Sequence, residues 1–396
     1  MPFHEVSRME SKLEFVRLAA APGANVRALC RRFGVSPTTG HKWLTRYRET
    51  GEAGLQEGSR RPHASPERCD RDVETAVVAM RVAHPAWGGR KIRRALLDKG
   101  VEDVPSPSTI TAIVHRHGLP VGEFGGGAKP WIRFEHAAPN DLWQMDFKGW
   151  VKLGDGGKLH PLTVLDDHSR FSIVLAACAD QKTATVREAL TGAFRRYGLP
   201  RAIITDNGSP WGDGPGSPYT PLGVFMIDQG VRIAHSRPYH PQTMGKDERF
   251  HRTLKAEALS GPLFADRPGA ARALEAWRHV YNHERPHEAL GLETPAARYA
   301  ASPREYRESP PPFDYAPGDM IRRVHDGGGV FFERQKRRLP KAFAGREVAL
   351  RPTTRDGVFE AFYRHQRIAV LDFTVQNGNP QPVHHVSEQV STMSPV

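Results

Sequence analysis

The stretch Leu142–Phe147 (LWQMDF) places one acidic residue, Asp146, inside a run of large apolar side chains that predicts a buried strand. A buried carboxylate without a partner is energetically costly, so a metal ion is a natural partner for Asp146. A second apolar run, 201–205, leads into Asp206 and an Asn-Gly turn, which predicts that this carboxylate lies at the edge of a sheet. The two acids predict an oxygen-rich site carried by strands.

A third acid, Glu248, lies near the start of a helix predicted to run from about 242 to 260. Its neighbour Asp247 points about 100° away on that helix, so only one of the two can face Asp146 and Asp206 squarely. Three separated carboxylates in a basic chain favour a site where oxygen ligands hold two Mg²⁺ or Mn²⁺ ions about 3.5–4 Å apart, suited to cutting and joining DNA phosphodiesters. For each acid taken alone, a surface or capping role is the better interpretation.

The length of 396 residues predicts roughly two to four domains. An apolar content of 39% with 25% charged residues is typical of a soluble globular protein. The sequence shows no run that could cross a membrane and no apolar core of a signal peptide, so we expect a cytoplasmic, nucleoid-associated protein. Three scattered cysteines support neither a disulfide framework nor a zinc site.

The net charge of +12 is unevenly distributed. Residues 1–130 carry 21 basic against 14 acidic residues, whereas residues 131–290 carry 20 against 18. An excess of positive charge upstream of the three acids is expected if a DNA-binding front end delivers DNA to a nearly neutral core. An ordinary soluble basic protein is the alternative.

Residues 9–47 read as three helices, and the turn 34–36 before the third contains a helix-ending glycine and an N-cap serine. This order predicts a helix-turn-helix domain over residues 1–50, with an ordinary three-helix bundle as the alternative. The third helix would bury Trp43 and Leu44 and could enter a major groove. The side chains expected to contact DNA are Thr38, Thr39, His41, Lys42 and Arg46.

Residues 51–68 form a basic linker, in which Arg60 and Arg61 could lie in a minor groove or simply be solvated. Residues 69–120 predict a second helix-turn-helix domain with a short recognition helix, 107–117, capped by Ser106. The expected DNA contacts of that helix are Thr109, Thr111, His115 and Arg116. Residues 121–139 are expected to be a linker.

Residues 140–300 predict an α/β core with a mixed sheet. The expected strands are 142–150, 159–165, 171–177, 201–205 and 231–235, and the expected helices are 185–197, 242–260 and 270–282. This order is that of an RNase H-like fold, except that no helix is evident between the last two strands, where 211–222 reads as a flexible loop. A Pro-rich linker (301–316), a small β-barrel (317–373) and a disordered tail (374–396) are expected to follow.

Several motifs in the core fit one pattern. They are Trp143–Asp146 (WQMD), Val164–Phe171 (VLDDHSRF), Ile204–Gly208 (ITDNG), Ser236–Thr243 (SRPYHPQT), Gly245–Arg249 (GKDER), Tyr281–His287 (YNHERPH) and Thr294–Ala296 (TPA). With these motifs the core resembles the DDE catalytic domain shared by retroviral integrases and bacterial insertion-sequence transposases. The resemblance spans roughly residues 140–300, and the N-terminal helices and β tail resemble the same transposases.

The resemblance implies a mixed five-stranded RNase H-like sheet in which Asp146, Asp206 and Glu248 are the catalytic residues and bind two Mg²⁺ or Mn²⁺ ions per active site. Glu248 is chosen over Asp247 because the family pattern is Lys-x-Glu-Arg. The groove for the DNA end would be lined by His240, Gln242, Lys246 and Arg249, with Lys255 on a phosphate. Asp166 and Asp167 would be structural. A longer spacing between Asp206 and Glu248, and Met244 where Asn is common, depart from the pattern.

The resemblance further implies a DNA transposase that binds the terminal repeats of a mobile element. Water would cut the phosphodiester at the element's end, and the freed 3′-OH would attack target DNA. The partners would be double-stranded DNA, as terminal repeats and as target, and further copies of the chain in at least a dimer, with no membrane. The alternatives are a catalytically silent, domesticated DNA-binding protein and an RNase H-like nuclease without strand transfer.

Overall fold

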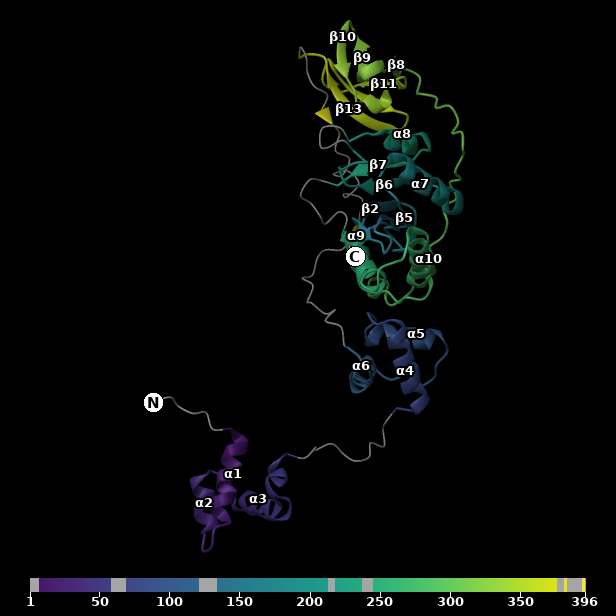
Figure 1. The fold of residues 1–396 in the computed structure, drawn as a ribbon. Coiled ribbons are helices and arrows are strands. Elements are labelled where there is room, and N and C mark those ends of the chain that lie inside the picture. The colour runs from purple at the N-terminus through teal and green to yellow at the C-terminus, as the bar shows by residue number, and fades with distance from the viewer. Residues whose placement is uncertain are drawn as a thin grey trace. The chain divides into compact units, whose positions relative to one another are not determined.

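The computed structural model describes residues 7–57, 69–120, 134–212, 218–236 and 245–375, together with the backbone of 381–382 and 394–395 (Figure 1). Arg60, Arg61, His240 and Gln242 lie outside these ranges, as does most of the expected linker 121–139. The chain forms two units, Met1–Arg68 and Cys69–Val396, which are described one at a time. In the part of the chain that the structure describes, no helix has both the length and the apolar character needed to cross a membrane.

The first unit contains the three predicted helices, α1 (Arg8–Ala19), α2 (Val26–Arg32) and α3 (Pro37–Thr50), followed by the 3₁₀ turn Gly51–Leu55. Its core consists of Phe15, Val16, Ala19, Cys30, Leu44 and Leu55. Ser36 caps α3 as predicted, since its Oγ accepts a hydrogen bond from the N–H of Thr39 at 3.1 Å.

Gly40 allows the helices of this unit to approach closely. A Cβ atom at Gly40 would lie 2.4 Å from Sγ of Cys30 and 2.8 Å from Cζ of Phe15. Leu44 is buried as predicted. Trp43 was also predicted to be buried, but its side chain is only partly buried. The reason is its place at the rim of the core, where it packs edge-on against Phe15 with ring centroids 5.8 Å apart.

The second unit begins with three helices, α4 (Arg71–Ala83), α5 (Gly89–Asp98) and α6 (Pro107–Arg116). Their shared core includes Val77, Trp87, Ile92, Ile110 and Ile113. Ser106 caps α6, because its Oγ accepts from the N–H of Thr109 at 3.3 Å. The predicted second pair of helices joined by a turn is therefore present.

The central sheet is mixed, as predicted, and runs in the order β5-β4-β2-β6-β7. The strands are β2 (Leu142–Phe147), β4 (Lys158–Asp166), β5 (Ser172–Cys178), β6 (Ala202–Thr205) and β7 (Arg232–His235). β4 is antiparallel to β2 and β5, whereas β2, β6 and β7 are parallel. A sixth strand, β3 (Val151–Lys152), pairs with the start of β4, so the prediction of five strands misses one short strand.

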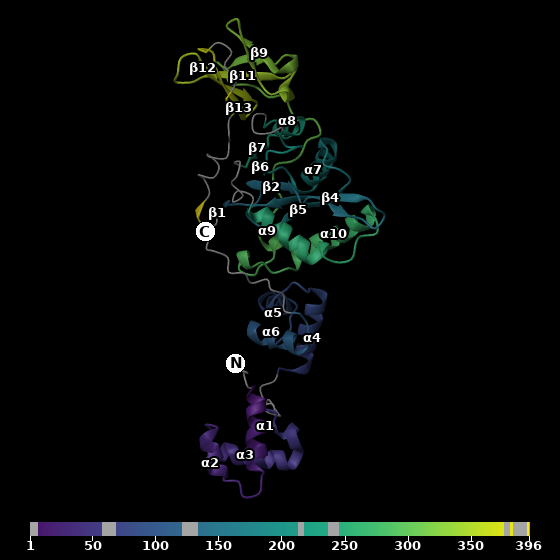
Figure 2. The ribbon, with the colours of Figure 1, turned by 60° about the vertical axis from the view of Figure 1, so that its left-hand side comes forward.

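Helices cover both faces of this sheet (Figure 2). α7 (Thr183–Tyr197) and α8 (Pro221–Asp228) pack on the face that includes Trp143, Met145 and Ile203. α9 (Gly245–Leu254), a π-helical turn (Lys255–Leu259) and α10 (Arg267–His283) pack on the other face, against Leu159, Leu165 and Leu175. The small helix α11 (Pro295–Arg298) follows.

The sequence-based expectation that no helix separates β6 from β7 is wrong, because α8 lies there. All six residues from Leu222 to Ile227 are buried, so the helix has no polar face and shows no helical periodicity in its sequence. Thr220 marks its start, with its Oγ1 3.4 Å from the N–H of Gly223. The predicted loop, 211–222, therefore ends where this helix begins, and only its last two residues belong to α8.

The C-terminal strands are β8 (Met320–Arg323), β9 (Gly329–Phe332), β10 (Gln335–Arg338), β11 (Glu347–Pro352), β12 (Val358–Tyr363) and β13 (Gln366–Asp372). They form an antiparallel sheet in the order β14-β13-β12-β11-β8 and a separate β9–β10 hairpin. These sheets do not close among the described residues, so the predicted barrel is not confirmed. Within the expected tail, β14 (Gln381–Pro382) pairs with β13, and β15 (Ser394–Pro395) pairs with β1 (Phe134–Glu135).

Side chains join this C-terminal sheet to the core. The side-chain amide of Gln366 accepts from the N–H of Ile233 at 3.3 Å and donates to the Ile233 carbonyl at 3.2 Å. Asp228 at the end of α8 forms ion pairs with Arg364 at 3.1 Å and with Arg346 at 3.3 Å. Because β7 ends the sheet order, Gln366 satisfies backbone groups on an otherwise open edge.

Candidate active site

Asp146 and Asp206 are brought together by the parallel pairing of β2 with β6. The pairing aligns Leu142 with Ala202 and Gln144 with Ile204, a constant offset of 60 positions along the chain. Continued by two residues, the same register places Asp146 beside Asp206, on the same face of the sheet. Asp206 lies just past the end of its strand, where the N–H of Gly208 donates to its Oδ1 at 3.0 Å.

The carboxylate of Asp146 is strongly influenced by its surroundings. Burial raises its pKa to about 6, against a hydrogen bond from the N–H of Phe147 that lowers it. The negative charges of Asp206 and Glu248 raise this pKa further. Asp206 and Glu248 therefore each lie close enough to act on the charge of Asp146, and both are exposed.

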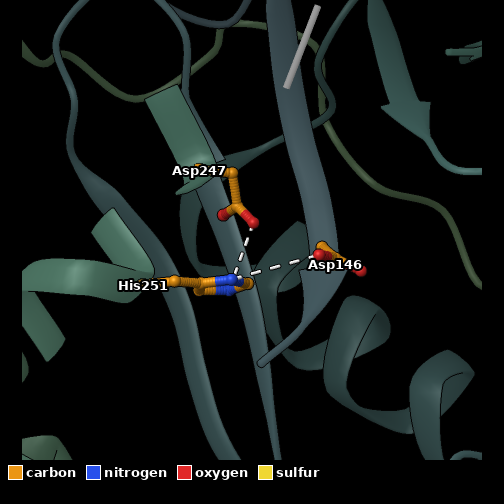
Figure 3. A group of neighbouring side chains, drawn as sticks. All are labelled: Asp146, Asp247 and His251. Atoms are coloured by element: carbon orange, nitrogen blue, oxygen red, sulfur yellow. Dashed lines mark ion pairs between the residues drawn. The ribbon is translucent and has the colours of Figure 1, made fainter. Parts of the chain in front are cut away.

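Asp247, the neighbour of Glu248 on α9, lies in the interior with 1% of its surface exposed. Its Oδ1 lies 3.1 Å from Oγ1 of Thr163, and its Oδ2 lies 3.1 Å from Nε2 of His251 (Figure 3). Burial raises the pKa of Asp247 well above its usual range, and the charge of Asp146 raises it further.

His251 is a site residue that the sequence-based interpretation missed. Its Nδ1 lies 4.0 Å from Oδ2 of Asp146, and its Nε2 lies 2.8 Å from Oγ1 of Thr163. Burial, with a contribution from Lys148, lowers its pKa to about 4, so the ring is neutral at pH 7. One signal was available: His251 stands four residues after Asp247 and so lies on the same face of α9.

The ligand sets open to a metal ion can be compared from these contacts. Asp146, Asp247 and His251 offer ligand atoms that all lie within 4.8 Å of one another. In that group Asp247 and His251 already contact each other. Asp146, Asp206 and Glu248 offer oxygens alone, which Mg²⁺ prefers, and a dication would relieve the repulsion that raises the pKa of Asp146. The all-oxygen set therefore matches the chemistry of a hard divalent ion, whereas among the described residues the ligand atoms that lie within 4.8 Å of one another belong to Asp146, Asp247 and His251.

Lys246, predicted to line the groove for a DNA end, is engaged inside the protein. Its Nζ lies 2.5 Å from Oδ2 of Asp167 and 3.2 Å from the carbonyl oxygen of the same residue. Asp167 also accepts from the N–H of His136 at 3.0 Å and from Nε2 of Gln144 at 2.8 Å. The described position of Lys246 thus serves the packing of α9, and contact with DNA would require this pair to open.

Asp166, like Asp167, is fully buried, which agrees with the structural role expected for both. Its Oδ1 accepts from the N–H of Ser169 at 2.8 Å, and its Oδ2 accepts from the N–H of Asn140 at 2.7 Å. The two acids thus stabilise the turn between β4 and β5.

The other predicted DNA contacts lie on three helices. Thr38, His41, Lys42 and Arg46 are exposed on α3, and Thr39 is half-buried with its hydroxyl 2.8 Å from that of Ser36. Thr109, Thr111, His115 and Arg116 are exposed on α6, where Arg116 pairs with Glu74 at 2.8 Å. Arg249 on α9 and Lys255 just after it are exposed.

Comparison with protein families agrees with this architecture. Two models described as "Integrase core domain" match residues 136–241 and 229–295. The middle of the chain is thus similar to an integrase core domain. Upstream of this integrase core, a helix-turn-helix domain model matches residues 11–63 and a homeodomain-like domain model matches 39–114. Downstream, the C-terminal domain of IS481 family transposases matches residues 319–379.

Similar proteins include two insertion-element products. An uncharacterised 31.7 kDa protein of element IS407 from Burkholderia multivorans is 29% identical over 44% of this chain and 61% of its own length. An uncharacterised 39.2 kDa protein of IS476 from Xanthomonas euvesicatoria is 32% identical over 42% of this chain and 46% of its own. The chain thus spans about half to three fifths of these relatives.

A solved intasome of simian T-cell lymphotropic virus, in complex with the PP2A regulatory subunit B56 gamma, is 17% identical to this chain. The match covers 73% of this chain and 96% of the solved one, with a TM-score of 0.36. The family models and relatives together confirm the expected resemblance to insertion-sequence transposases with a retroviral-integrase-like core.

Proposed function

We propose that this chain is the transposase of a mobile DNA element, with Asp146, Asp206 and Glu248 as its metal ligands. The observation that supports the proposal is the parallel register of β2 with β6, which brings Asp146 toward Asp206, together with Glu248 in the first turn of α9, inside the segment that matches the integrase core models. The intact set of acids argues against a DNA-binding protein without activity. The helix-turn-helix domains upstream argue against a nuclease that lacks strand transfer.

Two Mg²⁺ or Mn²⁺ ions bound by these oxygens would activate the attacking oxygen and stabilise the leaving one. The protein's own part is to fix the ligands. Asp146 is held by the N–H of Phe147 at 2.8 Å, and Asp206 by the N–H of Gly208 at 3.0 Å. Glu248 is carried into place by the first turn of α9. Ligands held in this way need little rearrangement when a phosphate enters.

The reaction consists of two displacements at phosphorus. In the first, a water oxygen bonds to the phosphorus at the element's end while the bond to the 3′ oxygen breaks, which leaves a 3′-OH and a 5′-phosphate. In the second, that 3′-OH bonds to a target phosphorus and displaces the target's own 3′ oxygen. The number of phosphodiester bonds is unchanged in the second step, so no external energy source is required.

The two helix-turn-helix domains would recognise the terminal repeats, with α3 and α6 as the helices that read the DNA. Two element ends must be joined in one event, so we expect at least a dimer on DNA. Its place of action would be the cytoplasm, at the nucleoid.

The test is cleavage and strand transfer on labelled duplexes taken from both flanks of the coding sequence, in Mg²⁺ or Mn²⁺. Wild type should cut the labelled strand at the element's end and join that end to target DNA. Glu248→Gln and Asp206→Asn should lower the rates of cleavage and strand transfer at least about a thousandfold, since each removes a ligand charge. Glu188→Gln, which changes an exposed acid on α7, is the matched control. Tight binding of a flank duplex by wild type without product in either metal would overturn the proposal in favour of DNA binding alone.

A further inference from the structure

Two acids stand next to each other at the start of α9, in opposite environments. Asp247 is 1% exposed, whereas Glu248 faces solvent. Neighbouring residues of a helix point about 100° apart, so the burial of Asp247 turns Glu248 outward. The contacts of Asp247 therefore decide where Glu248 points.

The first turn of α9 is fixed to the strand that carries Asp146. The backbone N–H of Asp247 donates to Oε1 of Gln144 at 3.2 Å, and Nε2 of Gln144 donates to Asp167 at 2.8 Å. Lys246, one residue earlier on α9, forms its ion pair with the same Asp167 at 2.5 Å. Two consecutive residues of the helix are thus tied to β2 and to the turn after β4.

The side chain of Asp247 leads to Asp146 through a second set of contacts (Figure 3). His251 contacts Asp247 at 3.1 Å through Nε2, and its Nδ1 lies 4.0 Å from the carboxylate of Asp146. The hydroxyl of Thr163 lies 3.1 Å from Asp247 and 3.0 Å from the carbonyl oxygen of Asp146. Thr163 therefore ties Asp247 to the backbone of Asp146, and the ring of His251 lies beside the Asp146 carboxylate at a distance longer than a hydrogen bond.

We propose that Asp247 and His251 are positioning residues, which hold the strand at Asp146 and the turn that carries Glu248 in the arrangement that binds the ion. This inference rests on the proposed function, because it concerns the same site. Groups that support metal ligands orient them, and their loss typically costs about 10–100-fold in metal affinity or activity.

The competing interpretation is that Asp247 and His251 are themselves ligands, since their atoms lie within reach of Asp146. The contacts favour positioning. Both oxygens of Asp247 are already engaged, Oδ1 with the hydroxyl of Thr163 at 3.1 Å and Oδ2 with Nε2 of His251 at 3.1 Å, so that carboxylate already has partners. A set of one imidazole and two carboxylates also suits transition metals better than Mg²⁺.

The experiment measures Mn²⁺ binding to the full chain by calorimetry without DNA, and strand transfer as a function of Mn²⁺ concentration. Asp247→Leu and His251→Phe should weaken Mn²⁺ binding roughly 10–100-fold and raise the Mn²⁺ concentration for half-maximal transfer by the same factor, because the supporting contacts are lost. Asp247→Asn and His251→Gln retain polar atoms at these places and should recover most of the affinity. Glu188→Gln serves as the control.

Three results would separate the possibilities. If Asp247→Asn abolishes Mn²⁺ binding as completely as Glu248→Gln, Asp247 is a ligand and the inference fails. It also fails if Asp247→Leu and His251→Phe lower only the unfolding temperature and leave Mn²⁺ affinity unchanged. If wild type binds Mn²⁺ but makes no product, the proposed function fails, and the affinities of the variants still decide whether the two residues position Asp146.

Discussion

Gln144 of β2 accepts a hydrogen bond from the backbone N–H of Asp247 at 3.2 Å, so the strand that carries Asp146 directly holds the start of α9. The other end of the same amide donates to Asp167. One buried side chain, 2% exposed, therefore joins three segments that are far apart in the sequence.

Gln144→Leu keeps the volume of the side chain but leaves the N–H of Asp247 and an oxygen of Asp167 without this partner. A buried polar group deprived of its partner costs about 1–3 kcal/mol, so we expect the free energy of unfolding to fall by about 2–5 kcal/mol in urea denaturation. Gln181→Leu, at an exposed position, should change it by less than about 0.5 kcal/mol. Equal effects of the two substitutions would contradict the bridging role of Gln144.

Asp167 should contribute stability that depends on pH. Burial alone would raise its pKa, but the charge of Lys246 and the hydrogen bond from it lower the pKa below its ordinary value. An acid of this kind stabilises the fold above its unfolded pKa of about 3.9, and the contribution is lost as pH falls through the folded value. Asp167→Asn, which also leaves Lys246 unpaired, should cost roughly 3–5 kcal/mol at neutral pH.

The difference in the free energy of unfolding between wild type and Asp167→Asn should shrink when denaturation is repeated below about pH 4, where wild type loses the negative charge that the substitution removes. Asp98→Asn is the matched control, because it breaks an exposed pair with Arg94 at 2.8 Å and should cost less than about 1 kcal/mol. A difference for Asp167→Asn that stays constant down to the most acid pH would show that its charge is not what stabilises the fold.

Gly40→Ala should destabilise the N-terminal unit, because the added carbon would come 2.4 Å from Sγ of Cys30. Overpacking of this kind costs about 1–3 kcal/mol, which calorimetry would detect as a lower unfolding temperature of that unit. The same substitution should weaken the binding of element-end DNA, because this unit carries the predicted recognition helix α3. Gly192→Ala on α7 meets no atom within 4 Å and should stabilise by up to about 1 kcal/mol. Similar unfolding temperatures for the two variants would count against close helix packing at Gly40.

Gln366→Leu should expose the edge of the integrase core sheet. It removes both partners of the Ile233 backbone, at 3.3 Å and 3.2 Å, and each orphaned group costs about 1–3 kcal/mol. Hydrogen exchange at the N–H of Ile233 should become faster, while Ile203 on the neighbouring strand β6 keeps its protection. Unchanged exchange at Ile233 would mean that another group covers this edge.

The sequence was sufficient to predict the mixed sheet, because its apolar runs identify the strands. It placed Asp146 within one run and Asp206 just after another, but the pairing of these two strands as neighbours is a property of the fold. The sequence could not predict α8, whose uniformly apolar residues carry no periodicity. The environment of Asp247 and the role of His251 were missed for a different reason. Their partners, Thr163 and Gln144, come from strands about 80 to 100 positions away, and local pattern carries no information on such contacts.

Lys246 shows the same limit in the opposite direction. The sequence places Lys246 beside a predicted catalytic acid, which indicates contact with a DNA phosphate. Only the folded chain reveals that Lys246 already forms an ion pair with Asp167. The sequence also could not decide whether the C-terminal strands form a closed barrel, since short apolar runs identify strands but not whether the sheet they form closes.

The constant offset between β2 and β6 has an evolutionary consequence. Side chains alternate between the two faces of a sheet, so a slip of one residue in this pairing would turn Asp206 to the opposite face from Asp146. A single-residue insertion or deletion in either strand could leave a chain that still folds but has lost its pair of acids. Under the proposed function, a copy of the element with such a change would no longer move by its own product and would depend on an intact copy for the enzyme.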